Sequence, residues 1–465
     1  MKAWSSEKIS VIALTLLITG AIDSIRNLPA TALFGSSLIF FFIFSAIVFL
    51  IPVALVSAEL SSTWSEEEGG VYSWVRNAFG DNIAFFTIWL QWINTIVWYP
   101  TILSFIAGTL AYLIDPALAQ NKLYLIVVII TLFWSLTFLG LTGIKSSASF
   151  ASFCAIIGMI VPMALIIILA CIWFFSGKPL SIDLSFNSLI PHWEDKQSWV
   201  SLTAIMTSFL GMELAAVHVR NVQNPQQNFP KAMFFSVILI LITMILGSLA
   251  IAIVLPKEEI GLVNGVMQAF TNFFKAYHLT PLMPVIVILL LIGSVGSMVN
   301  WIISPAKGLL LAADNGFLPH WLYRLNKHGV ASRILIMQAV IVTILCSGFL
   351  LLPSINSIYW LFTALSTELY IMMYVIMLIA AIRLKSKYSN LPRYFSIPGG
   401  NYGYYFTCIL GLIGCIIALI IGFFPPENAM DVGGSNHFRI IFSSGILLML
   451  SPAFLLYLRR RLSIK

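Results

Sequence analysis

Charged side chains are scarce in this sequence. Asp, Glu, Lys and Arg make up 9% of its 465 residues, whereas 60% of the residues are hydrophobic. A soluble domain of this length needs far more polar side chains to cover its surface, so the composition excludes one. We expect an all-α polytopic membrane protein, because a β-barrel would instead show short segments of alternating hydrophobicity.

The residues that carry most enzyme chemistry are also sparse. The five cysteines all fall in apolar segments at no metal-ligand spacing, and we expect them to be small buried hydrophobes rather than a disulfide framework. The six histidines are scattered, and we find no nucleophile–base set and no phosphate-binding loop. We therefore predict no enzyme activity, no cofactor and no metal, with a membrane enzyme kept as a remote alternative.

Long apolar runs are abundant. A membrane-spanning helix needs about 20 mostly apolar residues, and charged clusters, Pro and Gly mark the breaks between such runs. On this basis twelve transmembrane helices are predicted. They cover residues 9–33, 37–60, 83–113, 122–142, 147–175, 198–222, 232–255, 283–312, 333–352, 357–383, 404–424 and 438–458.

The distribution of positive charge predicts how these spans are oriented. With the N-terminus in the cytoplasm, 18 of the 25 Lys and Arg residues lie on the inner side, and Arg26 lies within a span. The six on the outer side are Lys122, Lys178, Lys196, Lys257, Lys275 and Arg439. This excess predicts a multi-pass protein of the inner (plasma) membrane with both termini in the cytoplasm. The net charge of +7 is then a topology signal, and we expect no nucleic-acid partner.

One of the predicted outer loops has a helical pattern of its own. The apolar residues of "GLVNGVMQAFTNFFKAY", within residues 256–281, recur at helical spacing. This pattern is typical of an amphipathic helix that lies along the membrane interface. Such a helix is either an outer lid over the bundle or a surface element without a gating role.

The first predicted span contains two full charges. In "TGAIDSIRNLP", Asp23 and Arg26 lie near the middle of an apolar run. Gly20 favours a loosened helix, Asp23 and Ser24 are good N-cap types, and Pro29 suits the first turn of a new helix. We predict that the helix is broken here.

A second break is predicted in the sixth span. "TSFLGMELAAVHVRNVQNP" combines Gly211 with Glu213, His218 and Arg220, and ends in an "NP" stop. Unwinding at both breaks frees backbone groups at the bilayer midplane, where lipid cannot satisfy them and a zwitterionic ligand can. Such a site suits an α-amino acid.

Two interrupted spans that lie five spans apart are typical of an inverted-repeat transporter. We predict a single transmembrane domain with a first repeat in residues 1–175 (spans 1–5), a second repeat in 198–383 (spans 6–10), and two additional spans in 404–458.

The polar residues also have simpler interpretations. Asp23 and Arg26 are three residues apart and would neutralise one another on one face of a helix. Glu213 would be a structural carboxylate and His218 would hydrogen-bond between helices, whereas Arg220 would lie at the cytoplasmic end of its span. The role of Glu368 in "TALSTELYIMMY" is ambiguous, and no substrate contact is predicted for it.

Several motifs carry a family resemblance. "ELSSTWSEEEGGVYSWVRNAFG" (59–80), "FLGMELAAVHVRNVQNPQQNFPKAM" (209–233) and "SPAKGLLLAADNGFLPHWLYRLNKHGV" (304–330) resemble conserved stretches of the amino acid–polyamine–organocation (APC) superfamily. "LPKEEIGLVNGVMQAF" (255–270) and "FSIPGG" (395–400) are similar to its glutamate/GABA antiporter branch. The resemblance implies the five-plus-five, LeuT-like fold with discontinuous helices 1 and 6. It also implies amino acid transport by alternating access, as an antiporter or a proton-coupled permease.

The resemblance also implies a substrate site between the broken spans. The span-1 break would hold the α-carboxylate and amine through Gly20, Ala21, Ile22, Asp23, Ser24 and Ile25. The facing walls would come from Ser208, Phe209, Gly211 and Met212 of span 6, from Asn94 and Trp98 of span 3, and from Trp301 of span 8. Coupling or gating is assigned to Glu213, which matches the family's span-6 acid, with His218 and Arg26. Ordinary helix packing is the alternative for Trp98 and Trp301.

Three departures from the family pattern keep other functions open. Asp23 stands where the family has a small residue, and Ser297 stands where the acid-resistance antiporters have an acid before the span-8 Trp. Only "LRRRLSIK" follows Tyr457, where those antiporters have a long tail. A carboxylate at position 23 would attract an amine, so an exchanger of amines, polyamines or cationic amino acids is the alternative, and a non-transporting nutrient sensor is a further one. We expect a small-molecule substrate, a bilayer, protons as a candidate coupling ion, and a monomer or homodimer.

Overall fold

The structure is a computed structural model, and it describes residues 9–64, 70–143, 154, 156–191, 196–214, 216, 222–310, 312–313, 316–426 and 434–463. Within these residues the regular elements are helices, and the β-type pairing is a single bridge between Ile9 and Val222. The longer helices are α1 (Val11–Ile22), α3 (Leu38–Ser45), α4 (Ile51–Thr63), α5 (Val71–Phe79), α6 (Asp81–Ala111), α7 (Lys122–Leu141), α9 (Val161–Phe175), α11 (Lys196–Thr207), α12 (Pro225–Ala252), α13 (Gly265–Ala276), α14 (Met283–Leu310), α15 (Ser332–Cys346), α17 (Ile355–Lys387), α18 (Gly400–Ile421) and α19 (Ser435–Ser463). The short ones include α2 (Leu28–Ala32), α10 (Phe186–Leu189) and α16 (Gly348–Leu351).

Eleven helical segments of the described residues are long and apolar enough to cross a membrane. They correspond to every predicted span except the sixth, 198–222. That span lacks a continuous helix, because α11 ends at Thr207. The predicted all-helical membrane architecture is confirmed, and the segment missing from the eleven is the one predicted to be broken.

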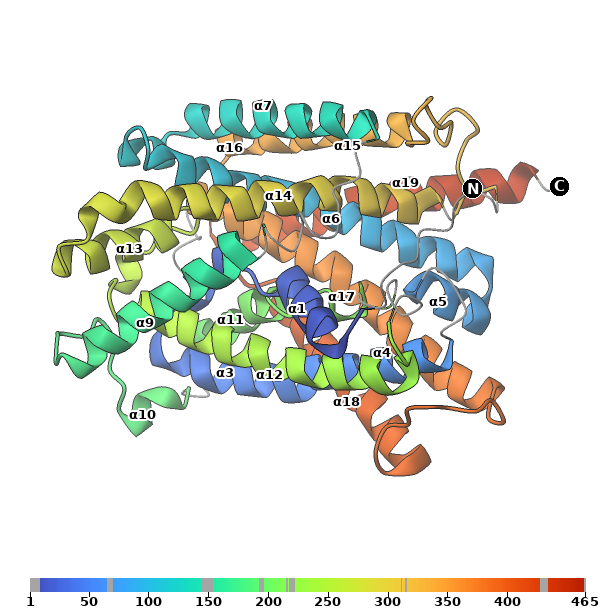
Figure 1. The fold of residues 1–465 in the computed structure, drawn as a ribbon. Coiled ribbons are helices and arrows are strands. Elements are labelled where there is room, and N and C mark those ends of the chain that lie inside the picture. The colour runs from blue at the N-terminus through green and yellow to red at the C-terminus, as the bar shows by residue number, and fades with distance from the viewer. Residues whose placement is uncertain are drawn as a thin grey trace.

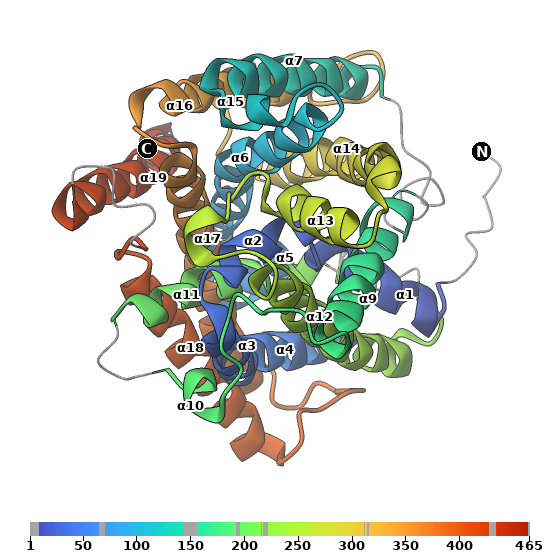
Figure 2. The ribbon, with the colours of Figure 1, turned by 90° about the vertical axis from the view of Figure 1, so that its left-hand side faces the viewer.

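Most of these helices run along a common direction (Figure 1). The short helix α10 and the helix α13 lie at one end of the bundle, and α5 lies at the other. Seen from the α10 and α13 end, α2 lies near the centre, whereas α7, α9, α18 and α19 lie around the periphery (Figure 2). The second half of the broken first span therefore runs through the middle of the molecule.

The centre of the bundle is held by long helices with polar cross-links. α6 packs against α17 and α14. The Trp92 indole N–H donates to Gln338 Oε1 over 2.7 Å, and the Tyr99 hydroxyl donates to the Trp301 carbonyl over 2.6 Å. Because Trp92 and Tyr99 are fully buried, these bonds satisfy groups that lipid could not.

The first span is broken where the charges predict it. The backbone N–H of Asp23 still bonds to the Thr19 carbonyl, so Asp23 closes α1, and Ser24 is extended. A 3₁₀ turn over Ile25–Asn27 leads into α2, with Pro29 in its first turn. The assignment of Asp23 as an N-cap was wrong, because it lies at the C-terminal end of the preceding half-helix. Ser24 occupies the N-cap position without a capping bond from its side chain.

The sixth span stops being regular helix at Ser208. The chain turns through Gly211, whose φ of +111° is a conformation open to glycine, and continues as a 3₁₀ turn over residues 212–214. The predicted site residue His218 lies outside the described residues, as does Arg220, which was expected at the cytoplasmic end of the span.

The predicted amphipathic helix is present as α13. Its apolar face is buried, and it packs against α2, α9, α12 and α14. Gly265, at its start, lies so close to Pro29 that an added Cβ would come within 2.8 Å of the proline ring. The helix therefore touches the second half of the broken first span.

The cysteines follow the expectation with one exception. All five are free, and Cys154, Cys346, Cys408 and Cys415 are buried. Cys171 is exposed; it lies on α9, which is at the periphery (Figure 2).

Candidate functional site

Asp23 is a buried carboxylate with half of its hydrogen-bonding capacity unused. Thr243 on α12 donates to Asp23 Oδ2 over 2.6 Å, whereas Oδ1 has no partner in the part of the chain that the structure describes. The Thr19 hydroxyl, one turn earlier on α1, is also buried and has no partner there. Because helix C-termini carry a partial negative charge, the carboxylate at the end of α1 adds to a local negative potential.

Arg26 is a buried guanidinium that faces a different set of helices. Its Nη1 donates to Thr101 Oγ1 over 2.8 Å, and the guanidinium carbon lies 4.7 Å from the centroid of the Trp98 ring. Among the described residues its Nε has no partner, and its backbone carbonyl accepts a 3.5 Å hydrogen bond from Tyr359 on α17. Thr101 and Trp98 belong to α6, and the Tyr359 hydroxyl also interacts with the guanidinium.

The two charges do not neutralise one another. Among the described residues neither Asp23 nor Arg26 takes part in an ion pair within 4 Å. The simpler interpretation, a pair on one helix face, fails because the helix ends between them and the side chains bond to α12 and α6. The break therefore has a negative pole at Asp23 and a positive pole at Arg26.

An aromatic wall adjoins the positive pole. The rings of Trp98 on α6 and Trp301 on α14 lie 5.2 Å apart between centroids, and the guanidinium of Arg26 lies over Trp98. The structure thus brings together three of the predicted site residues from three different spans. A Trp face attracts cations, so Trp98 stabilises a guanidinium that has no acidic partner in the described residues.

The span-6 acid is anchored more fully. Tyr370 on α17 donates to Glu213 Oε1 over 2.5 Å, and Tyr374 donates to Oε2. The Tyr374 hydroxyl also accepts from the Gly211 N–H over 2.8 Å. These bonds fasten the turn of span 6 to α17. The two tyrosines were not predicted, although their four-residue spacing places them on one helix face.

Three other predicted residues make contacts within and between the helices. Asn94 donates to the Gln91 carbonyl and accepts from Ser366 on α17, so its amide serves helix contacts. The Ser208 hydroxyl donates to the Ile205 carbonyl. Phe209 packs against Phe42, 5.7 Å between ring centroids.

The remaining predicted residues contribute mainly backbone or apolar surface. Ile22, Ile25 and Met212 are buried, Gly20 and Ser24 are half-buried, and the side chain of Ala21 lies outside the described set. Glu368 on α17 is buried and lies against Gly422 at the end of α18, and neither of its carboxylate oxygens has a partner among the described residues. Thr101 and Thr243, the partners of the two charges, carry no recognisable sequence signal.

A family model described as amino acid permease matches residues 9–451, nearly the whole chain. The chain belongs to the amino acid permease family. Its assignment to the APC superfamily and its prediction as an amino acid transporter with an all-helical membrane fold are thereby confirmed. Membership of a transporter family also agrees with the expectation that it is not an enzyme.

Similar proteins extend over almost all of this permease. It is 43% identical to an uncharacterised transporter of Legionella pneumophila over 424 residues, which are 91% of each chain. It is 27% identical to a glutamate/gamma-aminobutyrate antiporter of Lactococcus lactis, over 97% of this chain and 91% of that one. A probable agmatine/putrescine antiporter of the same species is 23% identical over 90% of this chain and 89% of its own. Relatives thus include the predicted branch and the amine alternative.

Proposed function

We propose that this permease exchanges amino acids across the plasma membrane by alternating access, with both termini in the cytoplasm. The observation that carries the proposal is the separation of Asp23 and Arg26 at the break of span 1. Each is buried, each keeps a polar atom that no described residue contacts, and their hydrogen bonds go to different helices. A zwitterion carries an ammonium group for Asp23 and a carboxylate for Arg26, so one ligand supplies the opposite charge to both residues.

The placement of the two charges argues for a ligand rather than for stability. A carboxylate stabilises a helix at its N-terminus and a cation stabilises one at its C-terminus. Here Asp23 closes α1, and Arg26 opens the next helical segment. Intramembrane charges without partners are functional by default, because each is costly to keep in the bilayer. The substrate ammonium would bind at Asp23 Oδ1, and a substrate carboxylate would bind at the Arg26 guanidinium.

The other site residues take supporting roles in this proposal. Gly20, Ala21, Ile22, Ser24 and Ile25 would present the freed backbone of span 1. Ser208, Phe209, Gly211, Met212, Asn94, Trp98 and Trp301 would form the walls. Glu213, which ties the span-6 turn to α17, would transmit movement of the broken helix and, with His218, couple it to protons. The repeats 1–175 and 198–383 would move relative to one another.

Two kinds of substrate are supported by different observations. The antiporters of Lactococcus lactis exchange, by name, glutamate with gamma-aminobutyrate in one case and agmatine with putrescine in the other. The unpartnered Oδ1 of Asp23 favours any amine, including diamines. The unpaired guanidinium of Arg26 disfavours a diamine, because like charges repel in a low-dielectric site. We therefore propose amino acids as the preferred substrates and diamines as the second candidates.

Counterflow in proteoliposomes tests the proposal. The purified chain would be reconstituted with labelled glutamate, glutamine, gamma-aminobutyrate or putrescine inside, and the same unlabelled compounds outside, at two pH values. Exchange driven only by compounds that carry a carboxylate supports the zwitterion site. Equal exchange of putrescine would favour the amine alternative. No exchange with a broad panel of amino acids and amines would favour the non-transporting nutrient sensor.

Two substitutions separate the poles. Arg26→Gln is expected to raise the KM for carboxylate-bearing substrates about 10- to 100-fold, since a charge-assisted hydrogen bond is worth roughly 1.5–3 kcal/mol. Asp23→Asn should raise the KM for every amine-bearing substrate by a similar factor. Lys275→Gln, an exposed cation on α13, is the control for removal of a positive charge. Unchanged exchange in both Arg26→Gln and Asp23→Asn would refute the site.

A further inference from the structure

Glu368 is an intramembrane acid that the proposed substrate site does not use. It lies near the middle of α17 and is 1% exposed, and neither carboxylate oxygen has a hydrogen-bond partner among the described residues. The ion pairs found in that part of the chain do not include it. Residues 427–433, which lie outside the described residues, contain no Lys, Arg or His. A bare charge is too costly at such a place, so a buried acid without a partner holds a proton.

The contact that Glu368 makes with α18 also opposes a negative charge. Its carboxyl group fills the place of a side chain on Gly422, where an added Cβ would lie 1.8 Å from Oε1. Gly422 caps the C-terminal end of α18, and a helix C-terminus carries a partial negative charge. The neutral, protonated form of Glu368 is therefore the form that fits this contact.

Few ionisable groups face Glu368 from the helices that pack against α17, which are α4, α5, α6, α11, α16, α18 and α19. On α18 the Cys415 thiol lies on the same helix face as Gly422, about two turns earlier, and no Asp, Glu, Lys, Arg or His occurs between Gly400 and Ile421. On α19 the Arg439 guanidinium lies over the ring of Phe424, 4.7 Å from its centroid. His437 lies in the first turn of α19, and Lys196 is the first residue of α11. The other Asp, Glu, Lys and Arg residues of these helices are paired elsewhere or lie at the far end of α19: Glu59, Arg76, Asp81, Arg459, Arg460 and Arg461.

Glu368 lies between the residues that connect α17 to the broken sixth span. The preceding residue, Thr367, hydrogen-bonds to Thr207, the last residue of α11. Two residues further along α17, Tyr370 donates to Glu213. Because α11 packs against both α17 and α18, a movement of span 6 acts on both sides of the contact between Glu368 and Gly422.

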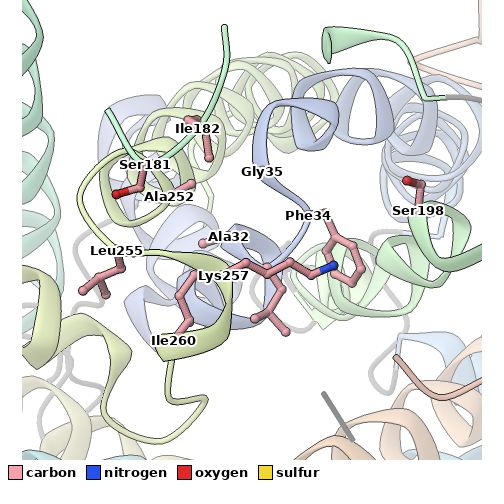
Figure 3. Close-up of a pocket in the computed structure, with 11 residues that line it drawn as sticks. Ala32, Phe34, Gly35, Ser181, Ile182, Ser198, Ala252, Leu255, Lys257 and Ile260 are labelled. Carbon is pink, nitrogen blue, oxygen red and sulfur yellow. The ribbon is translucent and has the colours of Figure 1, made fainter. Parts of the chain in front are cut away.

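The carboxyl group is shielded from the cavity at the end of the bundle. This cavity of about 290 Å³ lies between the turn after α2, the segment between α9 and α10, the first turn of α11, and the segment between α12 and α13 (Figure 3). Its lining residues include Phe34, Ile182 and Ile260, but not Glu368. Exchange of the Glu368 proton with water therefore requires a movement of the helices.

We propose that Glu368 is a proton-binding site of the transporter, which holds a proton while its carboxyl group contacts Gly422 and releases it to water when span 6 moves. The proposal rests on the proposed function and adds a second proton-binding group to Glu213. The two acids differ, because each oxygen of Glu213 accepts from a tyrosine hydroxyl, whereas no described residue donates to Glu368. Since the proton is bound more tightly in the closed contact, a lower pH shifts the population toward that conformation.

Infrared spectroscopy tests the proton site without requiring transport. A protonated carboxyl group has a C=O stretching band that is separate from the bands of a carboxylate. The purified chain, reconstituted in lipid at neutral pH, is expected to show such a band that Glu368→Gln lacks and that Glu368→Asp shifts. Glu213→Gln is the matched control, in which the Glu368 band should persist. Identical spectra of the wild type and Glu368→Gln in this region would overturn the proton site, whatever the counterflow assay shows.

Proton flux tests the role of the site in transport. Proteoliposomes that contain a pH-sensitive dye would be given glutamate outside, and the wild type is expected to move protons as the amino acid moves. Glu368→Gln, which mimics the protonated acid, should lose this flux and keep counterflow of labelled glutamate, and Glu368→Asp should recover the flux. No flux in the wild type, equal flux in Glu368→Gln, or loss of counterflow together with flux would overturn the assignment. An infrared band of Glu368 in a wild-type chain without counterflow would retain the proton site and refute the proposed exchange.

Discussion

Glu59 provides a prediction whose size can be worked out from the structure. It is fully buried at the end of α4, near the C-terminal end of α17. One carboxylate oxygen accepts from Lys385 over 2.8 Å and from Arg393 over 2.7 Å, and the other accepts from the Ile397 N–H over 2.8 Å. The substitution Glu59→Gln keeps the volume and removes the charge.

Removing one member of a buried ion pair typically costs 3–5 kcal/mol, because the remaining charge stays buried without a partner. Lys385 and Arg393 are 11% and 8% exposed and lie 4.4 and 5.7 Å from the Tyr404 ring. Water and this ring partly stabilise the two cations after the carboxylate is removed. We therefore expect a loss at the lower end of the range, about 3 kcal/mol. With an unfolding entropy of about 1 kcal/mol/K for a chain of this length, Tm should fall by roughly 3 °C.

The chain contains a matched control for this change. Glu368 is equally buried, but neither of its carboxylate oxygens has a partner within the described ranges. Glu368→Gln should therefore leave Tm unchanged or raise it, since no hydrogen bond is lost. Thermal unfolding of the purified chain in detergent, followed by tryptophan fluorescence, measures both variants. A Tm of Glu59→Gln within about 1 °C of wild type, or an equal fall in both variants, would refute the reasoning.

Three further substitutions test the breaks and the packing. Tyr370→Phe removes the 2.5 Å bond to Glu213 and should destabilise the chain by about 1–3 kcal/mol; an unchanged Tm would show that this bond does not hold the span-6 turn. Gly211→Ala introduces a side chain at φ +111° and should cost about 1–3 kcal/mol while lowering the exchange rate, so a variant with full activity and stability would contradict the assigned turn. Gly293→Val would drive a side chain into the backbone of Gly158 and should abolish the monodisperse peak in size-exclusion chromatography, which a normal peak would disprove.

The sequence predicted the two helix breaks, but it did not predict which helices the side chains of Asp23 and Arg26 contact. A lone Asp and Arg in an apolar run, flanked by Gly20 and Pro29, indicate a break from local information alone. The partners of Asp23 and Arg26 lie 220 and 75 residues away in the chain. No local pattern relates such distant threonines to a charge, so a mutual pair was as reasonable an expectation as two separate poles.

The same limit explains the sixth span and the span-6 acid. A hydropathy count treats residues 198–222 as one span, whereas the regular helix ends at Thr207 and the chain turns through Gly211 with its positive φ. The motif identified Glu213 but not the tyrosines that hold it, which come from α17. Helix α13, by contrast, was predicted correctly because its apolar face is encoded within twelve consecutive residues.

The partners of the buried charges distinguish the two charges of the span-1 break from Glu59 and Glu213. Glu59 and Glu213 both use each carboxylate oxygen, and both tie one helix to another. Asp23 and Arg26 are as deeply enclosed, yet among the described residues each keeps a polar atom unused. Glu368 is also buried with both oxygens unpartnered there, so what sets Asp23 and Arg26 apart is their position at the break. The fold could have paired these two across an unbroken helix. Instead, the helix ends between them, and their side chains bond to α12 and α6. This arrangement supports the proposed ligand, which would supply the opposite charge to each residue only while it is being carried.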